Sequence, residues 1–357
     1  MLRSQLSPLR GGLVITAVVL AACGSSATPA PTQAPAATAA PVATAAPTAV
    51  ASASASPAPS AAIVPLPGER IAYGVRAGDS SYIVSQLADG SDLVRLTSAP
   101  GHQLCAAFSP DASQIVYCAS AGGPFEIWTM RADGTNQTQV TNLGGRALFP
   151  DMSPDGSKFV FAGTEGTDEH TEVYVVDATG GNLVALTSCA DGKAGCANDY
   201  PAWSPDGKQI VFSHQDDADA DDAGINQQIW VMNADGSKAR ALTTGPEPKD
   251  QLADWNPDGG SIAYASGTSN NEGIWVMRAD GTKPKQISGC VAGDVEPCAA
   301  GTDIGPAWSP DGKSIAFVRG FGAVGSDDRP VFVMNADGTG QRRLSPEPIL
   351  AAVPAWR

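Results

Sequence analysis

The chain has 357 residues and a formal net charge of −15 at pH 7, from 22 Lys and Arg against 37 Asp and Glu. This acidic balance argues against nucleic acid as a partner and against docking on anionic lipid headgroups. The length is sufficient for one large domain or two small ones, so composition along the chain has to decide the organisation.

The first 22 residues have the features of a secretory signal. Arg3 and Arg10 precede an apolar run from Leu13 to Leu20, which is far shorter than the roughly 20 residues of a membrane-spanning helix. The sequence Leu20-Ala-Ala-Cys23 follows and resembles the bacterial lipobox. The resemblance implies cleavage before Cys23 and lipidation of that residue. The alternative is an ordinary cleaved signal followed by a chance cysteine.

Residues 24–67 contain no charged residue and consist almost entirely of Ala, Pro, Thr and Ser. Such a segment buries too little apolar surface to offset the entropy lost on ordering, so we expect a disordered, extended tether. The expected organisation is a signal peptide at 1–22, a tether at 23–67 and a folded domain at 68–357. We expect the mature chain to be extracytoplasmic and attached to a membrane only through its lipid.

An internal repeat is the strongest signal in the folded part. The motif Pro201-Ala-Trp-Ser-Pro-Asp-Gly207 recurs at Pro306–Gly312, and each copy precedes a second signature such as Ile229-Trp-Val-Met-Asn-Ala-Asp-Gly236. A short segment that ends in Leu-Thr follows. Ser-Pro-Asp-Gly and Ala-Asp-Gly are tight-turn sequences, and the β-branched and aromatic runs between them are typical of strands. Each repeat therefore predicts four antiparallel strands, A to D, which form one propeller blade.

The number of blades to expect equals the number of times that the aromatic or Met residue of strand A recurs along the chain. The N-terminal repeat, which starts at Arg70, has strands B, C and D, whereas the chain ends on a strand A alone. Pairing of these two ends would complete a blade and remove exposed sheet edges. We therefore predict an all-β fold, a six-bladed β-propeller of four-stranded antiparallel blades, closed by the C-terminal strand joining the N-terminal blade. The six strand-A positions are Phe108, Met152, Trp203, Trp255, Trp308 and Trp356.

These motifs resemble those of the TolB-like, WD-repeat-like propeller family. The resemblance covers roughly residues 68–357 and rests on the Pro-Ala-Trp-Ser-Pro-Asp-Gly and Trp-Val-Met-Asn-Ala-Asp-Gly sequences. Propellers of this family mostly bind proteins, so the resemblance implies a protein-binding role.

The two faces of the expected propeller differ in their loops. The A–B and C–D turns lie at one face, the tight-turn face, and the B–C and D–A connections lie at the other, the long-loop face. Function tends to reside on loops held by a rigid scaffold, so we predict binding at the long-loop face. The candidate binding residues there are His170, His214, Asp216, Asp222, Asp327 and Asp328.

One acidic loop resembles the start of a calcium-binding loop. Oxygen ligands stand at alternate residues, Asp217, Asp219 and Asp221, but Asp222 and Gln228 replace the expected Gly and Glu. A solvated acidic loop is the alternative interpretation. We therefore expect no cofactor, and calcium at these three aspartates stays the alternative.

Six cysteines follow Cys23, and an even number in an exported chain indicates disulfides. The sequence alone allows many pairings, and spacing together with the repeat alignment favours local ones. The favoured pairs are Cys105–Cys118, Cys189–Cys196 and Cys290–Cys298.

No nucleophile elbow or phosphate-binding loop is present in the sequence. Asp151 and Asp254 precede the strand-A aromatic or Met position, where the other four repeats have Ala. Because strand A lines the channel of a propeller, these carboxylates are acid–base candidates, and hydrogen bonding to nearby groups is the alternative.

The sequence thus predicts a monomeric, non-enzymatic, lipid-anchored scaffold of the cell envelope, whose partner is an envelope or extracellular protein. The alternative is a propeller that binds or processes envelope glycans through its acidic long-loop face.

Overall fold

The computed structural model describes residues 68–166, 170–189, 196–215, 227–244, 249–268, 271–289, 301–321, 329–346, 351 and 353–357. The chain divides into two units, Met1–Ala62 and Ile63–Arg357, and all of these residues lie in the second. Their regular structure consists of 24 β-strands. Within the same residues, no helix has the length and apolar character needed to cross a membrane.

Four sheets each contain four antiparallel strands that are paired in chain order. Each sheet ends on a strand of two residues. The strands are β8 (Gly144–Met152), β9 (Lys158–Glu165), β10 (Glu172–Asp177) and β11 (Val184–Ala185); β12 (Ala197–Trp203), β13 (Gln209–Gln215), β14 (Gln227–Asn233) and β15 (Arg240–Ala241); β16 (Gln251–Trp255), β17 (Ser261–Thr268), β18 (Asn271–Arg278) and β19 (Lys285–Gln286); and β20 (Gly301–Trp308), β21 (Ser314–Phe321), β22 (Val331–Asn335) and β23 (Arg342–Arg343).

The other eight strands form one sheet in which two sets of four meet. A single parallel pair, Ser81 with His102, joins the two sets. The C-terminal strand pairs with the first strand through Ile71 with Trp356. The first set is β24 (Ala355–Trp356), β1 (Arg70–Ala77), β2 (Ser80–Leu87) and β3 (Val94–Arg95), and the second is β4 (His102–Phe108), β5 (Gln114–Ser120), β6 (Glu126–Arg131) and β7 (Thr138–Gln139).

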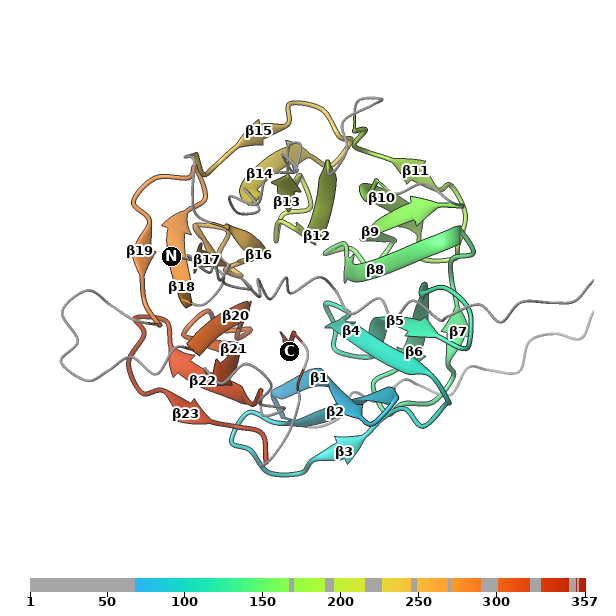
Figure 1. The fold of residues 1–357 in the computed structure, drawn as a ribbon, viewed down its shortest axis with the longest axis horizontal. Coiled ribbons are helices and arrows are strands. Elements are labelled where there is room, and N and C mark those ends of the chain that lie inside the picture. The colour runs from blue at the N-terminus through green and yellow to red at the C-terminus, as the bar shows by residue number, and fades with distance from the viewer. Residues whose placement is uncertain are drawn as a thin grey trace, which may run out of the picture. The chain divides into compact units, whose positions relative to one another are not determined.

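The sheets surround a common axis, with strands such as β8, β16 and β20 on the inside and the two-residue strands β3, β7, β11, β15, β19 and β23 at the rim (Figure 1). The prediction of an all-β propeller made of four-stranded antiparallel blades is thereby confirmed. The aromatic residues of the inner strands pack between neighbouring sheets. Trp255 of β16, for example, is 5% exposed and packs with Val211 of β13 and Tyr264 of β17.

The aspartates of the two turn motifs hold the tight turns together. Asp206 accepts hydrogen bonds from the Ser204 hydroxyl at 2.8 Å and from the Lys208 backbone N–H at 3.1 Å. The hydrogen bond from the Lys208 ammonium at 2.9 Å, together with these two bonds, lowers the pKa of Asp206 to about 2. Asp235 accepts bonds in the same way from the hydroxyl and N–H of Ser237. The turn sequences therefore recur because each aspartate satisfies backbone donors that the turn leaves unpaired.

Two of the three favoured disulfides are present. Cys105 on β4 is bonded to Cys118 on β5, with 5.5 Å between their Cα atoms. Cys189 is bonded to Cys196, with a Cα separation of 5.8 Å. The third pair, Cys290 with Cys298, lies outside the described residues, as does Cys23.

The hydroxyl of each Leu-Thr segment, or its Ser counterpart, binds the backbone of the preceding strand. It accepts a hydrogen bond of 2.9 to 3.0 Å from the N–H of the residue 14 positions earlier. The outermost strand is too short to satisfy that N–H by itself, so the hydroxyl extends the pairing. The donor and acceptor pairs are Ile83 with Thr97, Ile127 with Thr141, Val173 with Thr187, Ile229 with Thr243, Ile274 with Ser288 and Val331 with Ser345.

Replacing one of these hydroxyls by a methyl group will destabilise the fold. Thr97 is 1% exposed, so Thr97→Val leaves the buried N–H of Ile83 without an acceptor. We expect the free energy of unfolding, measured with urea, to fall by about 1 to 3 kcal/mol. Thr97→Ser keeps the acceptor and serves as the control. A Thr97→Val variant as stable as the unsubstituted chain would contradict the role of the hydroxyl.

Candidate functional site

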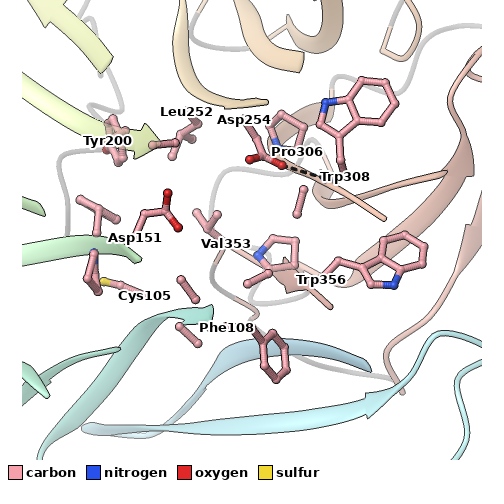
Figure 2. A pocket seen from close by; sticks show the side chains of 18 of the residues that line it. Cys105, Phe108, Asp151, Tyr200, Leu252, Asp254, Pro306, Trp308, Val353 and Trp356 are labelled. Atoms are coloured by element: carbon pink, nitrogen blue, oxygen red, sulfur yellow. Dashed lines mark hydrogen bonds between the residues drawn. The ribbon is translucent and has the colours of Figure 1, made fainter. Parts of the chain in front are cut away.

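A cavity of about 140 Å³ lies where the inner strands converge, and we call it the hub cavity. Residues of β4, β8, β12, β16, β20 and β24, or next to these strands, line it. Figure 2 shows the carboxyl groups of Asp151 and Asp254 directed toward this space, with Tyr200, Leu252 and Val353 around it. The cavity therefore combines an apolar lining with a few ionisable groups, namely the two carboxyl groups, the Tyr200 hydroxyl and the Arg357 guanidinium, a common composition for binding sites.

A β-bulge in each of β4, β8, β12, β16 and β20 shapes the hub cavity. The bulge lies three residues before the strand-A aromatic or Met position. Its residue has a φ of 53° to 57° at Cys105, Phe149, Tyr200 and Leu252, and 61° at Gly305. Bulky residues rarely adopt this left-handed conformation, which costs roughly 1 kcal/mol or more per residue. The strain is retained at four non-glycine positions that all line the cavity.

Two aromatic rings from adjacent bulges meet at the wall of the hub cavity. The ring centroids of Phe149 and Tyr200 are 4.3 Å apart, with an interplanar angle of 49°. Sequence analysis missed this pair, because the bulge positions share a place in the repeat but no residue type. The only signal in the sequence that could have located these bulge residues is their fixed place, three residues before the repeated aromatic or Met of strand A.

Asp151 and Asp254 each join two neighbouring inner strands. Asp151 on β8 accepts a hydrogen bond from the backbone N–H of Trp203 on β12 at 2.8 Å. Asp254 on β16 accepts one from the N–H of Trp308 on β20 at 2.8 Å, the bond dashed in Figure 2. The structure thus shows hydrogen bonding to nearby groups for one oxygen of each carboxylate. The sequence had offered this role as the alternative to acid–base chemistry.

Burial raises the pKa of both carboxyl groups. Burial raises the pKa of Asp254 to about 7, although the Trp308 N–H and the Arg357 charge act in the opposite direction. The negative charge of Asp151 raises it further. Burial also raises the pKa of Asp151, again against its Trp203 hydrogen bond and Arg357. The charge of the hub cavity therefore changes near neutral pH.

The long-loop end of the propeller holds a hydrogen-bonded network around Glu172. This carboxylate accepts bonds from the Cys189 N–H and, at 2.9 Å, from the Asn198 side chain. Asn198 Oδ1 lies 2.8 Å from Nδ1 of His214. The predicted residue His214 is thus tied to a network that includes the Cys189–Cys196 disulfide.

His170 lies directly before Thr171, at the same end of the propeller. Arg146 Nη2 donates a hydrogen bond to the Thr171 hydroxyl at 2.8 Å. Close by, burial raises the pKa of Asp199 to about 6, against the positive charge of Arg146. Sequence analysis named neither Arg146 nor Asp199, since neither belongs to a motif.

The remaining predicted site residues are not placed. Within the described residues, no group of three or more His, Cys, Asp or Glu is arranged to hold a metal ion. The binding and calcium candidates that lie outside these residues stay predictions, and they are Asp216, Asp217, Asp219, Asp221, Asp222, Asp327 and Asp328.

The raised pKa of Asp254 predicts a pH-dependent effect of Asp254→Asn. The pKa is 3.8 without the fold and about 7 within it, so the folded state binds this proton more tightly. Its contribution to stability is therefore present at low pH and is lost as the pH rises through 7. The neutral Asn keeps an acceptor for Trp308. We expect the gain in unfolding free energy from Asp254→Asn to be about 2 kcal/mol larger at pH 8 than at pH 5.

Urea denaturation at both pH values measures this effect, and Asp258→Asn at an exposed turn is the control. A gain from Asp254→Asn that is the same at pH 5 and pH 8 would contradict the raised pKa.

The comparisons with known proteins agree with this fold. Residues 47–221 match the family model described as the TolB beta propeller domain. An uncharacterized protein of Agrobacterium fabrum is 32% identical over 163 residues, which cover 43% of this chain and 49% of that protein. The chain thus spans about half the length of this curated relative.

Two solved structures are similar in fold. TolB from Acinetobacter baumannii has a TM-score of 0.64 at 20% identity, over 80% of this chain and 66% of that one. A putative TolB from Agrobacterium tumefaciens has a TM-score of 0.58 at 22% identity, over 78% and 88% of the two chains. Identities this low support the shared fold alone.

Proposed function

The chain carries a β-propeller of the TolB-like family, and from this premise we propose that it is an extracytoplasmic protein-binding module of the cell envelope. The hub cavity is the observation that carries the proposal. Its strained bulge residues are costly to maintain, and such strain persists where the surrounding structure and a function depend on it. At about 140 Å³ the cavity accommodates one or two side chains, so a partner would insert side chains there while it covers the mouth.

A binding role without catalysis fits the two carboxylates. Asp151 and Asp254 each use an oxygen to link inner strands through the N–H groups of Trp203 and Trp308. The hydrogen bond holds each carboxylate in a fixed position. Its other oxygen remains available to accept a hydrogen bond from a partner. We therefore propose recognition of a protein and not turnover of a glycan.

The proposed location outside the cytoplasm is supported by the disulfides Cys105–Cys118 and Cys189–Cys196. The cytosol keeps thiols reduced, whereas exported proteins retain disulfides. In this proposal Cys23 is the lipid anchor and residues 24–67 form the tether.

We also propose that the propeller has six blades and is closed by its C-terminal strand. The eight-stranded sheet contains two sets of four strands, and a single parallel pair, Ser81 with His102, connects them. Each set has the antiparallel order of the other four sheets. The pairing of Ile71 with Trp356 would then be the contact that closes the ring.

Removal of the Trp356 side chain tests this closure. Trp356 is 5% exposed and packs in a cluster with Ile71, Tyr73 and Ala307. We expect Trp356→Ala to lower the unfolding free energy by about 3 to 5 kcal/mol, as for other buried Trp residues. Trp308→Ala, within a sheet of consecutive strands, is the matched control. A loss at Trp356 that is far smaller than the loss at Trp308 would argue against closure.

Site-specific photo-cross-linking in the native host tests the binding role. A photoreactive residue at the exposed Glu165, at the long-loop end of β9, should yield one dominant protein adduct. The same residue at exposed Asn136, in a tight turn, is the control and should yield none. Adding Phe149→Ala should weaken the Glu165 adduct at least severalfold if partner side chains enter the hub cavity. A folded, well-expressed chain that gives no protein adduct at Glu165 would overturn the proposal.

A further inference from the structure

An arc of basic residues follows the rim of the tight-turn face over three consecutive sheets. They lie on or beside β15, β18, β19 and β23, and each side chain is exposed. Figure 1 shows β15, β19 and β23 in sequence along one side of the rim. We call this set the basic arc, and its members are Lys238, Arg240, Arg278, Lys283, Lys285 and Arg342.

The other half of the rim has fewer exposed basic residues, with Arg95 on β3 exposed and Arg131, the counterpart of Arg278, half-buried. The positions that correspond to Lys283 and Lys285 are occupied by Asn136 and Thr138 beside and on β7, and by Asn182 and Val184 beside and on β11. Exposed basic residues are therefore concentrated in one half of the propeller, and the lysines at 283 and 285 do not follow from the repeat itself.

A groove of about 230 Å³ lies within the basic arc. Arg278, Lys283 and Lys285 line it together with Asp337 and the buried apolar side chains of Met277 and Ile287, so cations outnumber carboxylates three to one. None of the three cations forms a salt bridge with a carboxylate of the described residues. Besides the hydrogen bonds within their turns, the nearby charges of Arg278 and Lys285 still lower the pKa of the Asp280 and Asp337 carboxyl groups. The excess of cations above an apolar floor nevertheless suits a ligand that has an anionic head and an apolar stem.

The N-terminal segment joins the propeller at the same face as the basic arc. The Glu69 carbonyl accepts a hydrogen bond from the N–H of Ala88, next to a C–D turn, at 3.0 Å. Arg70 begins β1, just as Ser261 begins β17 and lines the groove. Residue 68, at which the described part of the chain begins, therefore lies at the tight-turn face.

We propose that the basic arc docks on an anionic phospholipid surface, with a phosphate headgroup in the groove. This inference rests on the proposed lipid anchor at Cys23, because stable attachment commonly combines a lipid with a basic patch. The anchor raises the local concentration of the propeller at the membrane, and the arc selects which face meets it.

The net charge of −15 does not prevent this docking, because charge acts locally in salt. A strand of seven residues such as β13 spans roughly 20 Å between the two faces. The turn aspartates of the tight-turn face, such as Asp235, Asp280 and Asp337, lie beside the basic arc and offset part of its charge. The Debye length is about 8 Å at physiological ionic strength, so the acidic residues of the long-loop face are screened from a surface at the tight-turn face. The sequence-based expectation averaged charges over the whole chain and missed this separation. Docking would leave the long-loop face directed away from the membrane.

Vesicle sedimentation at low salt tests the inference without the lipid anchor. The mature chain with Cys23→Ser is mixed with vesicles of phosphatidylcholine alone or with added phosphatidylglycerol. We expect binding to the anionic vesicles only, and its loss in 0.5 M salt. Lys285→Glu should weaken the binding about tenfold, because charge reversal replaces an attraction with a repulsion. Arg76→Glu, an exposed site away from the arc, makes the same charge change and should have little effect.

Equal binding to both vesicle types, no binding at low salt, or equal binding of Lys285→Glu and the unsubstituted chain would each overturn the inference. Binding of an acidic polypeptide but not of vesicles would overturn the assignment to a membrane. The proposed anchor is tested separately by the release of Cys23→Ser from the membrane fraction of the host. If the variant stays in the membrane fraction, the proposed anchor is wrong, and the vesicle result is unaffected.

Discussion

The propeller depends on the burial of both faces of each small sheet against its neighbours. Phe212 of β13 packs with Val160 of β9, and Tyr264 of β17 packs with Val211 of β13. A sheet of four short strands has two apolar faces and is not stable alone, so the sheets stabilise one another in sequence. Their convergence brings the inner strands together. The bulges, the carboxylate links and the hub cavity all arise at this point of convergence.

Much of this architecture could be predicted from the sequence because it depends on local, repeated chemistry. The turn aspartate Asp206 and the terminal hydroxyl of Thr243 satisfy backbone donors nearby in the chain, so their residue types recur. The Cys105–Cys118 disulfide was also predictable, because its cysteines stand on paired strands either side of one turn. These features need only the repeat and its spacing to be recognised.

The candidate site was less predictable, because backbone conformation and not residue type defines it. The bulge residues Cys105, Phe149, Tyr200 and Leu252 differ chemically, yet they share a left-handed φ and the same orientation toward the cavity. The upward pKa shift of Asp254 depends on burial that only the assembled ring provides. The predictions for the acidic loop at 216–222 fall outside the described residues and stay predictions.

The carboxylate links also break the rotational symmetry of the hub. Asp151 and Asp254 connect β8 to β12 and β16 to β20, whereas the corresponding positions on β4, β12, β20 and β24 are alanines. The repeats are alike around the axis, but the charged groups of the cavity come from only three of the inner strands, with Arg357 following β24. An inserted side chain would therefore meet a single preferred direction and not several equivalent ones. In the proposed binding role, two aspartates among four alanines would thus let a nearly symmetric scaffold hold its partner in one orientation.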